Sequence, residues 1–187
     1  MDPMDAFASS QKLSLEEFGQ HFETFRSRAF RFECLPIYRV ASEKGAFINF
    51  SRGEKNPPSD FNENWIEILK KVSSRRAEIQ RVRLLTSTPT EYIRFECEWG
   101  YKRQTKYGEK ILFLEENTFK KINNFSITID YWLFDEDIAY YMIYDFVGQF
   151  MGVLKANNLW TTKLREQATR LVTFAKDISF LDAYLLK

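Results

Sequence analysis

The apolar residues of this chain switch between helical and strand periodicity, and this switching constrains its fold more than any other feature. After Ser14, large apolar residues recur every three or four positions, which predicts an amphipathic helix over residues 15–27. Ser14 and Glu17 have the spacing of a capping box, in which each side chain binds the other residue's backbone N–H. Residues 29–35 instead alternate between apolar and charged side chains, which predicts a half-buried strand ended by Pro36.

A short helix and a linker follow this strand. Ser42 and Glu43 begin the helix, which runs to Phe50, and Gly53 is placed as its stop. Residues 53–60 are polar and contain two adjacent prolines, as is typical of a linker. The linker is short, so we expect it to join elements of one domain rather than to separate two.

A second helix and strand come next. The helix begins near Asn64 and carries its apolar residues on one face. Residues 79–85 predict a strand in which Val82 points inward while Arg81 and Arg83 lie on the opposite face.

Residues 89–99 carry both periodicities, because their clean alternation favours a strand while their ends favour a helix. The start and stop residues of that helix are Thr88 as N-cap, Pro89, Glu91 and Gly100. We predict a helix, since its start has a physical mechanism, with Arg94 and Glu98 paired one turn apart on the outer face.

The last part of the chain predicts a run of strands and then one long helix. Residues 102–108 have the composition of a basic, mobile loop. The predicted strands are residues 111–114, 127–134, 138–144 and 149–155, the last three forming a β-meander with an acidic first turn. Asn157 and Asn158 open a predicted helix over residues 158–185, which has one apolar stripe.

Together these elements predict an α/β (mixed α+β) fold. We expect a single domain over residues 13–187, preceded by a flexible leader at residues 1–12. Its central mixed sheet would carry the C-terminal β-meander and the long C-terminal helix.

The composition excludes several classes of protein. The chain has 187 residues, 44% apolar and 28% charged, as expected of a folded domain with a sizeable core. Its 27 Lys and Arg nearly cancel 26 Asp and Glu, so we do not expect direct nucleic-acid binding. No apolar run approaches the roughly 20 residues that span a bilayer, and the acidic start lacks the features of a signal peptide. We therefore expect a cytoplasmic protein without a membrane segment.

Aromatic residues make up 17% of the chain, with 18 Phe, 9 Tyr and 4 Trp. They indicate either an aromatic core or a surface on which planar ligands stack. Stacking surfaces usually interleave aromatics with Lys, Arg and Gly, and that interleaving is weak here. We favour the core.

Motifs of well-known catalytic and cofactor sites are missing from the sequence, so we expect no cofactor. His21 is the only histidine and lies in the first predicted helix, where we expect a structural role. Two cysteines, Cys34 and Cys97, are too few for a disulfide framework, and we expect both to be small core residues. Residues 135–137 form an acidic cluster that predicts a hairpin turn rather than a metal site.

Arginine and glutamate recur on three predicted elements, as Arg31 and Glu33, Arg81 and Arg83, and Arg94 and Glu96. One interpretation is a set of surface salt bridges, each worth about 0–1 kcal/mol. The other is a cleft in which guanidinium groups bind a phosphate or carboxylate. In that cleft, Glu33 and Glu96 would neutralise part of the charge and leave a net positive pocket.

A series of motifs runs in fixed order from about Phe22 to the last helix. The motifs are Arg28-Ala-Phe-Arg-Phe-Glu33, Tyr38, Glu43, Gly53-Glu54, Trp65, Arg81-Val-Arg83, Tyr92-Ile-Arg-Phe-Glu96, Gly108-Glu109, Asp130-Tyr-Trp-Leu-Phe-Asp135 and Tyr144-Asp145. This series resembles an uncharacterised bacterial family, the domain of unknown function 6879. Its motifs contain all our candidate ligand-binding residues, which are Arg31, Glu33, Arg81, Arg83, Arg94, Glu96, Asp130 and Trp132.

The resemblance implies a fold more than a function, because no activity is established for the family. Its members often lie beside helix-turn-helix regulators in actinobacteria, which implies such a regulator, or another protein, as a partner. A weaker resemblance links the strand at residues 79–85 and the acidic hairpin to half of a phospholipase D-type domain. That family needs a His-x-Lys motif, whereas His21 is followed by Phe and Glu, so its phosphodiesterase chemistry would be lost.

Three hypotheses of function follow. The leading one is a non-catalytic, cytoplasmic binding or regulatory module whose Arg/Glu-lined cleft receives a phosphate- or carboxylate-bearing ligand. The alternative is an enzyme acting on a nucleotide or phosphorylated substrate, with Glu33 or Glu96 as general base and the arginines as a clamp. The third is an interaction protein that uses exposed aromatics on the hairpin or the final helix.

Overall fold

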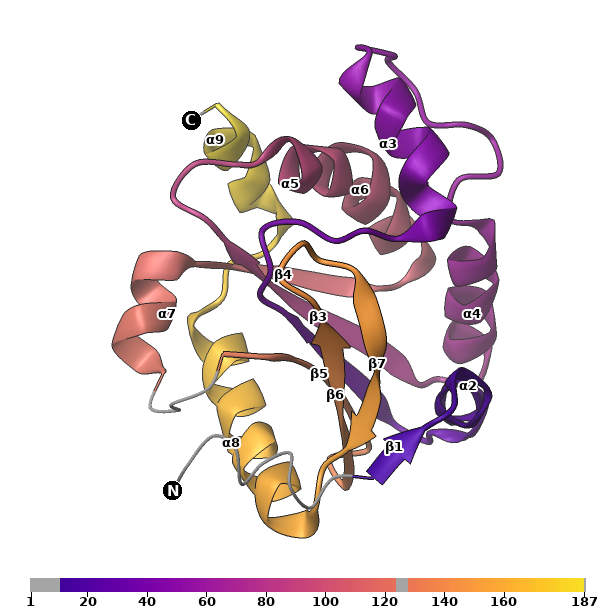
Figure 1. The fold of residues 1–187 in the computed structure, drawn as a ribbon, viewed down its shortest axis with the longest axis vertical. Coiled ribbons are helices and arrows are strands. Elements are labelled where there is room, and N and C mark those ends of the chain that lie inside the picture. The colour runs from indigo at the N-terminus through magenta and orange to yellow at the C-terminus, as the bar shows by residue number, and fades with distance from the viewer. Residues whose placement is uncertain (1–10, 124–127, 187) are drawn as a thin grey trace.

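The computed structural model describes residues 11–123 and 128–186, which contain one seven-stranded mixed sheet in the order β1-β7-β6-β5-β2-β3-β4 (Figure 1). The strands are β1 (Gln11–Leu13), β2 (Arg28–Glu33), β3 (Glu78–Leu85), β4 (Lys110–Glu115), β5 (Asp130–Phe134), β6 (Ile138–Tyr144) and β7 (Phe150–Lys155). Strands β2, β3 and β4 run parallel, and β5 joins β2 in the antiparallel sense. Strands β5, β6 and β7 form the predicted β-meander, and β1 pairs with β7 at the edge.

The helices lie on both faces of this sheet. The α-helices are α2 (Leu15–Thr24), α3 (Lys44–Ser51), α4 (Glu63–Ser74), α5 (Glu91–Phe95), α6 (Lys102–Gln104), α7 (Glu116–Ile122), α8 (Asn158–Phe174) and α9 (Leu181–Leu185). The chain also contains the 3-10 helices η1 (Ala41–Glu43), η3 (Thr105–Tyr107) and η4 (Ile178–Phe180), and the π-helix η2 (Glu96–Tyr101). The predicted mixed α/β fold with its C-terminal helix is confirmed.

Two apolar clusters hold the layers together. On one face, Phe30, Phe32 and Val82 pack beneath α7 and α8, in a cluster that includes Leu164 and Leu171. On the other face, α2 and α4 cover the first residues of β2 and β3 and much of the meander. Figure 1 shows α7 and α8 on one side of the sheet and α2 and α4 on the other. The abundant aromatics therefore serve mainly as core.

Several local predictions hold because they rest on neighbouring residues alone. Ser14 and Glu17 form the capping box of α2, and the Asn157 side chain caps α8. Gly53 has a φ of 83° just after α3, a left-handed conformation that suits glycine at a helix stop. The hairpin turn between β5 and β6 lies where the acidic cluster predicts it, with Asp135 accepting N–H bonds from Arg26 and Ser27.

The segment predicted as a helix over residues 89–99 is helical, but both of its predicted ends are wrong. The N-cap is Thr90 rather than Thr88, since the Thr90 hydroxyl accepts a bond from the Ile93 N–H. Gly100 does not end the helix, because the π-helix η2 runs through it into α6 and η3. The stop is Gly108, with φ 96°. The basic segment at residues 102–108 is therefore largely helical and not a loop.

Two further boundaries differ from the sequence prediction. The final helix ends at Phe174, and residues 178–185 form the separate turns η4 and α9. Residues 1–10 of the predicted leader lie outside the described residues, whereas Gln11 and Lys12 belong to strand β1. In the described part of the chain, no helix is both long and apolar enough to cross a membrane.

The strands β2 and β3 are not half-buried, as their alternation predicts, but buried on both faces. Arg31, Glu33, Arg81 and Arg83 are all buried. Alternation shows that a strand has two chemically different faces, but it does not tell whether the polar one meets water.

Candidate functional site

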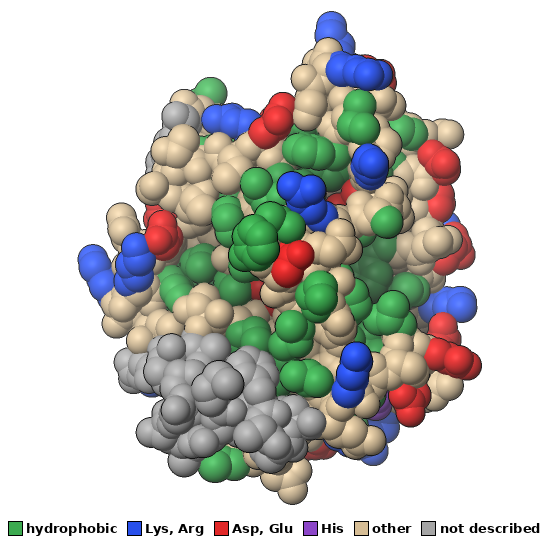
Figure 2. Space-filling view, in the orientation of Figure 1, with side chains coloured by type: hydrophobic (Ala, Val, Ile, Leu, Met, Phe, Trp, Pro, Cys, Tyr) green, Lys and Arg blue, Asp and Glu red, His purple; other side chains and the backbone are tan. Residues whose placement is uncertain are grey.

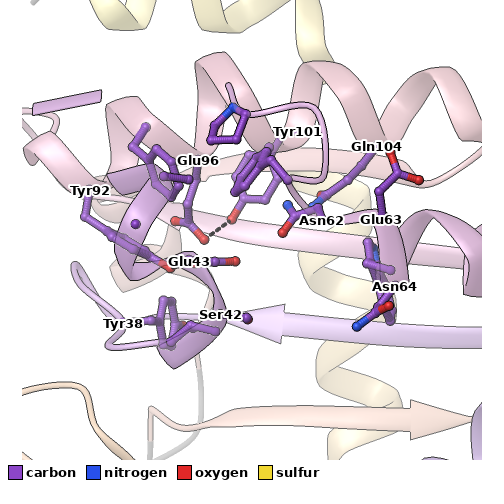
Figure 3. A pocket seen from close by; sticks show the side chains of 18 of the residues that line it. Tyr38, Ser42, Glu43, Asn62, Glu63, Asn64, Tyr92, Glu96, Tyr101 and Gln104 are labelled. Carbon is purple, nitrogen blue, oxygen red and sulfur yellow. Dashed lines mark hydrogen bonds between the residues drawn. The ribbon is translucent and has the colours of Figure 1, made fainter. Parts of the chain in front are cut away.

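A pocket with a volume of about 830 Å³ opens beside the carboxyl ends of the parallel strands β2 and β3. Its walls come from η1 and α3, from the loop and first turn of α4, and from α5 and η2. In open α/β sheets, the carboxyl ends of parallel strands are where ligands usually bind. Figure 3 shows Glu43, Glu96 and Tyr101 gathered in this pocket.

The floor of the pocket is built on Arg81. Its Nη1 lies 2.5 Å from Glu33 Oε1, and its Nε lies 2.8 Å from Glu109 Oε1. The Trp65 indole N–H donates to the other oxygen of Glu109 at 2.7 Å. Both carboxylates therefore hold the one guanidinium that lines the pocket, as far as the described residues show.

A second buried ion pair lies beside the first. Arg83 Nη2 is 2.9 Å from Glu96 Oε2, and Arg83 Nη1 donates to the Leu35 carbonyl at 2.6 Å. The Tyr101 hydroxyl oxygen is 2.9 Å from a carboxylate oxygen of both Glu33 and Glu96. A tyrosine hydroxyl has one proton, so it can donate to only one of these two groups.

The charges around Glu33 and Glu96 shift the pKa values of these two carboxyl groups in opposite directions. Burial by itself would raise the pKa of Glu33, but Arg81, Arg31 and Arg83 outweigh it and hold the pKa at about 2. Burial raises the pKa of Glu96 to about 8, and Glu33 and Glu43 add to the rise against the effect of Arg83. Of the two carboxylates that contact the Tyr101 hydroxyl, Glu96 is therefore the one that takes up a proton first as the pH falls.

Arg31 belongs to the same buried layer but lies beneath the pocket. Its Nη2 is 2.7 Å from Asp130 Oδ2 and its Nε is 3.4 Å from Glu33 Oε1. Tyr38 and the Cys34 backbone N–H also donate to Asp130, at 2.6 and 3.0 Å.

Trp132 places its ring against the Arg31 guanidinium, 5.6 Å from ring centre to guanidinium carbon. Asp130 and Trp132 thus lie under the pocket as supports rather than in its wall.

The structure brings together seven of the eight candidate residues and leaves one out. Arg94 lies apart, on the outer side of α5, where it donates to the Leu185 carbonyl and lines a shallow groove with Lys102. Glu98 lines the same groove, so the predicted outer-face position of both residues holds, but no ion pair joins them in the described structure. Whether the other seven bind a ligand stays a prediction.

The pocket is not net positive, which corrects the charge that the sequence predicts. Among the described residues, the acidic side chains in its wall are Glu33, Glu43, Asp60, Glu63 and Glu96. Arg81 is the basic side chain that opposes them, and it is already paired. The sequence places Glu33 and Glu96 correctly as partial neutralisers and also selects Asp130, but it misses Glu109. Asp130 and Glu109 complete the neutralisation of Arg31 and Arg81.

Glu43 is a carboxylate of the pocket wall that has no cationic partner within the described part of the chain. It accepts a bond from the Tyr92 hydroxyl at 2.7 Å, and no ion pair to it occurs among the described residues. Burial raises the pKa of Glu43, and the Tyr92 bond only partly offsets that rise. A positively charged group in the pocket would stabilise its ionised form.

Tyr38, Glu43 and Glu109 carry much of the site's geometry, yet sequence reasoning did not select them. The sequence feature that could have identified them is their membership of the ordered motif series. Among the described residues, no three His, Cys, Asp or Glu side chains are arranged to hold a metal ion.

An apolar surface lies near the pocket opening. Its exposed members are Ile37, Val40, Phe146 and Val147, and Phe146 is 98% exposed. Arg39 N–H donates to the Gly148 carbonyl, which ties the segment after β2 to the β6–β7 turn. Figure 2 shows hydrophobic side chains gathered in the middle of one face, with charged ones mostly toward its rim.

The ordered series of motifs and the fold they build can be compared with known families. A family model described as "Domain of unknown function (DUF6879)" matches residues 16–179. The chain belongs to this family. The match covers strands β2 to β7, the pocket and α8, so this geometry describes a DUF6879 domain. No curated protein matches the chain. The weaker resemblance to a phospholipase D half stays a prediction.

Proposed function

We propose that this DUF6879 protein is a binding module for a small organic cation. The observation that carries the proposal is the charge of the pocket wall, where carboxylates outnumber the single paired guanidinium. Carboxylates line a concave, partly apolar space of about 830 Å³, which is the size range of small-molecule sites.

Glu43 is the primary partner in this proposal. Its carboxylate is largely withdrawn from water and has one hydrogen bond, from Tyr92, with no cation beside it. An ammonium or guanidinium group placed here would gain a charge-assisted hydrogen bond, worth about 1.5–3 kcal/mol. The rings of Tyr38, Tyr92 and Tyr101 line the same space, and aromatic faces attract cations.

An anionic ligand, which the sequence predicts, fits this pocket less well. Arg31, Arg81 and Arg83 each hold a buried carboxylate at 2.5–2.9 Å. The Nη1 of Arg31 is unbonded in the described structure, but it belongs to a residue that does not line the pocket. A phosphate in the pocket would also meet Glu43 and Asp60. Like charges at close range disfavour such binding by several kcal/mol.

Titration calorimetry at pH 7.5 with three probes of similar shape tests the proposal. Phenethylamine is the cation, 3-phenylpropionate the anion and phenethyl alcohol the neutral control. We expect binding of the amine, and loss of that binding in Glu43→Gln but not in Glu98→Gln or Arg94→Ala, which lie outside the pocket. Binding of the carboxylate, of inorganic phosphate or of a nucleotide in preference to the amine would restore the anion hypothesis.

A second candidate function is acid–base catalysis in the same pocket. It rests on the pair Glu33 and Glu96, whose pKa values lie at about 2 and about 8 although Tyr101 joins them. Carboxylates separated in this way suit different roles in catalysis. Glu96 would act as a general acid near neutral pH rather than as the base that the sequence suggests. Turnover of a bound ligand that Glu96→Gln abolishes, with binding retained, would establish this function.

The regulatory side of the hypothesis also stays a proposal. Phe146, exposed on the β6–β7 turn, supports a protein partner such as a helix-turn-helix regulator. The free thiols of Cys34 and Cys97 support a reducing, cytoplasmic location. Co-elution of a regulator encoded beside the gene, lost in Phe146→Ser, would test the partner.

A further inference from the structure

We infer that the ligand is an aliphatic α,ω-diamine, whose two ammonium groups lie at opposite ends of the pocket with an uncharged chain between them. This inference rests on the proposed function and specifies its ligand. It follows from three separate regions of the pocket, which are two acceptor-rich ends and a central aromatic section.

The first end contains Glu43. It comes from η1, and Figure 3 shows it beside Glu96, Tyr38, Ser42 and Tyr92. Its carboxylate has a hydrogen bond from Tyr92 but no cationic partner among the described residues. An ammonium group brings three N–H donors and one positive charge, which this end lacks.

The second end lies at the start of α4. Figure 3 shows Glu63, Asn64 and Gln104 on the side of the pocket away from Glu43 and Tyr38. Asp60 precedes this helix and also lines the pocket, and no ion pair to its side chain is seen in the described structure. Glu63 is held by Arg103, so Asp60 is the carboxylate available here.

An unsatisfied acceptor independently marks the second end. The Gln104 side chain is 7% exposed, lines the pocket, and its Oε1 has no hydrogen-bond donor. Buried amide oxygens are nearly always bonded. A second ammonium group would supply the missing donor and would be neutralised by Asp60.

The middle of the pocket is unsuited to a third positive charge. Tyr101 contributes an aromatic ring there (Figure 3), and the Arg81 guanidinium lies 5.6 Å from its centre and 5.9 Å from the centre of the Trp65 ring, which also lines the pocket. A cation placed at the middle would be repelled by Arg81, whereas methylene groups would pack on the rings. The charge distribution therefore calls for cationic ends and an apolar centre.

Calorimetry with α,ω-diaminoalkanes of four, six, eight and ten carbons, and with 1-aminoalkanes of the same lengths, tests this. We expect one diamine length to bind at least 10-fold more tightly than its monoamine. Asp60→Asn should bring that diamine down to the monoamine's affinity, and Gln104→Leu should weaken it in the same direction. Glu98→Gln, on the outer side of η2, is the matched control and should bind like the wild type.

The outcomes separate the two proposals. If neither series nor phenethylamine binds, the proposed function itself is overturned, whereas binding of phenethylamine alone would overturn only the diamine inference. If monoamines bind as tightly as diamines at every length, the cation site stands and the diamine inference is overturned. Tighter binding of spermidine, which carries a central charge, would overturn the apolar centre. Circular dichroism of each variant shows whether a lost affinity reflects lost folding.

Discussion

The two faces of strands β2 and β3 bury opposite kinds of side chain to the same extent. On one face, Phe32 and Val82 are 0% exposed under α7 and α8, and on the other Arg83 is also 0% exposed. The apolar face gains free energy simply by leaving water. The charged face must recover the loss of hydration through ion pairs, and Arg31, Arg81 and Arg83 each have one.

This difference indicates what each face contributes. Buried ion pairs add little net stability compared with apolar residues of the same volume, although removing one partner alone is strongly destabilising. We therefore interpret the apolar face as the source of stability and the charged face as the support of the pocket. The charged layer holds Glu96 and Tyr101 in place and sets the proton that they share.

The largest effect is expected when one partner is removed from the charged face. Arg81→Met leaves Glu33 and Glu109 buried without their cation and should lower the free energy of unfolding by about 3–5 kcal/mol. Urea denaturation measures this. Lys70→Met, which removes an exposed pair with Glu67, should change it by less than about 1 kcal/mol. A loss equally small in Arg81→Met would show that the buried layer tolerates unpaired charge.

The apolar face is tested through the C-terminal helix. Leu164→Ala, at a buried position of α8, should cost about 2–5 kcal/mol, whereas Leu159→Ala, 52% exposed on the same helix, should cost little. Denaturant titration of both variants gives the comparison. If truncation after Asn157 left a soluble domain with the same melting temperature, α8 would be an appendage and not part of the core.

A somewhat smaller effect is expected from pH. The folded state keeps the Glu96 proton up to a pKa of about 8, whereas the unfolded chain releases it near the usual 4.5. Its contribution to stability is therefore complete below pH 4.5 and is lost as pH rises through 8. Between these two pKa values, the free energy of unfolding falls by about 1.4 kcal/mol for each pH unit. About 2–3 kcal/mol of stability is therefore lost between pH 5 and 7.

Glu96→Gln isolates this term, because a glutamine has no proton to release. The variant should lose less stability than the wild type as the pH rises from 5 to 7, as measured by urea unfolding at each pH. Glu98 is an exposed neighbour on the same turn. The free energy of unfolding of Glu98→Gln should therefore change with pH as it does in the wild type. Parallel curves for Glu96→Gln as well would mean that Glu96 is ionised in the folded protein.

The smallest effect is expected at His21, which lies outside both the charged layer and the pocket. Its Nε2 lies 2.5 Å from the Tyr140 hydroxyl, and its ring packs on Phe134. His21→Ala should cost about 1 kcal/mol, the worth of one hydrogen bond, and leave ligand affinity unchanged. Lost binding with unchanged thermal stability would instead give the histidine a role in function.

Much of the fold could be predicted because its determinants are local. The capping box at Ser14, the cap at Asn157 and the acidic turn after Phe134 each depend on residues within a few positions. The same reasoning placed the helix ends near Gly100 wrongly, since η2 continues through it. A glycine permits a helix to end, but here the packing of η2 against β4 and α9 favours continuation of the helix through Gly100.

The candidate site could be predicted only in part. Alternation in residues 29–35 and 79–85 correctly grouped Arg31 with Glu33 and Arg81 with Arg83. The recurrence of Arg and Glu on three elements also added Arg94, which lies apart from the pocket, because its position depends on how its helix is rotated against the sheet. It missed Glu43 and Glu109, which reach the site from other segments of the chain.

The sequence by itself determined which side chains share a strand face and where most helices begin, because backbone geometry and capping act over a few residues. Only the tertiary structure decided that the charged face of β2 and β3 is buried, through the helices that cover it. It also decided the sign of the pocket's charge. Asp130 and Glu109 pair with Arg31 and Arg81 across 99 and 28 residues of chain, and electrostatic interactions depend on distance in space.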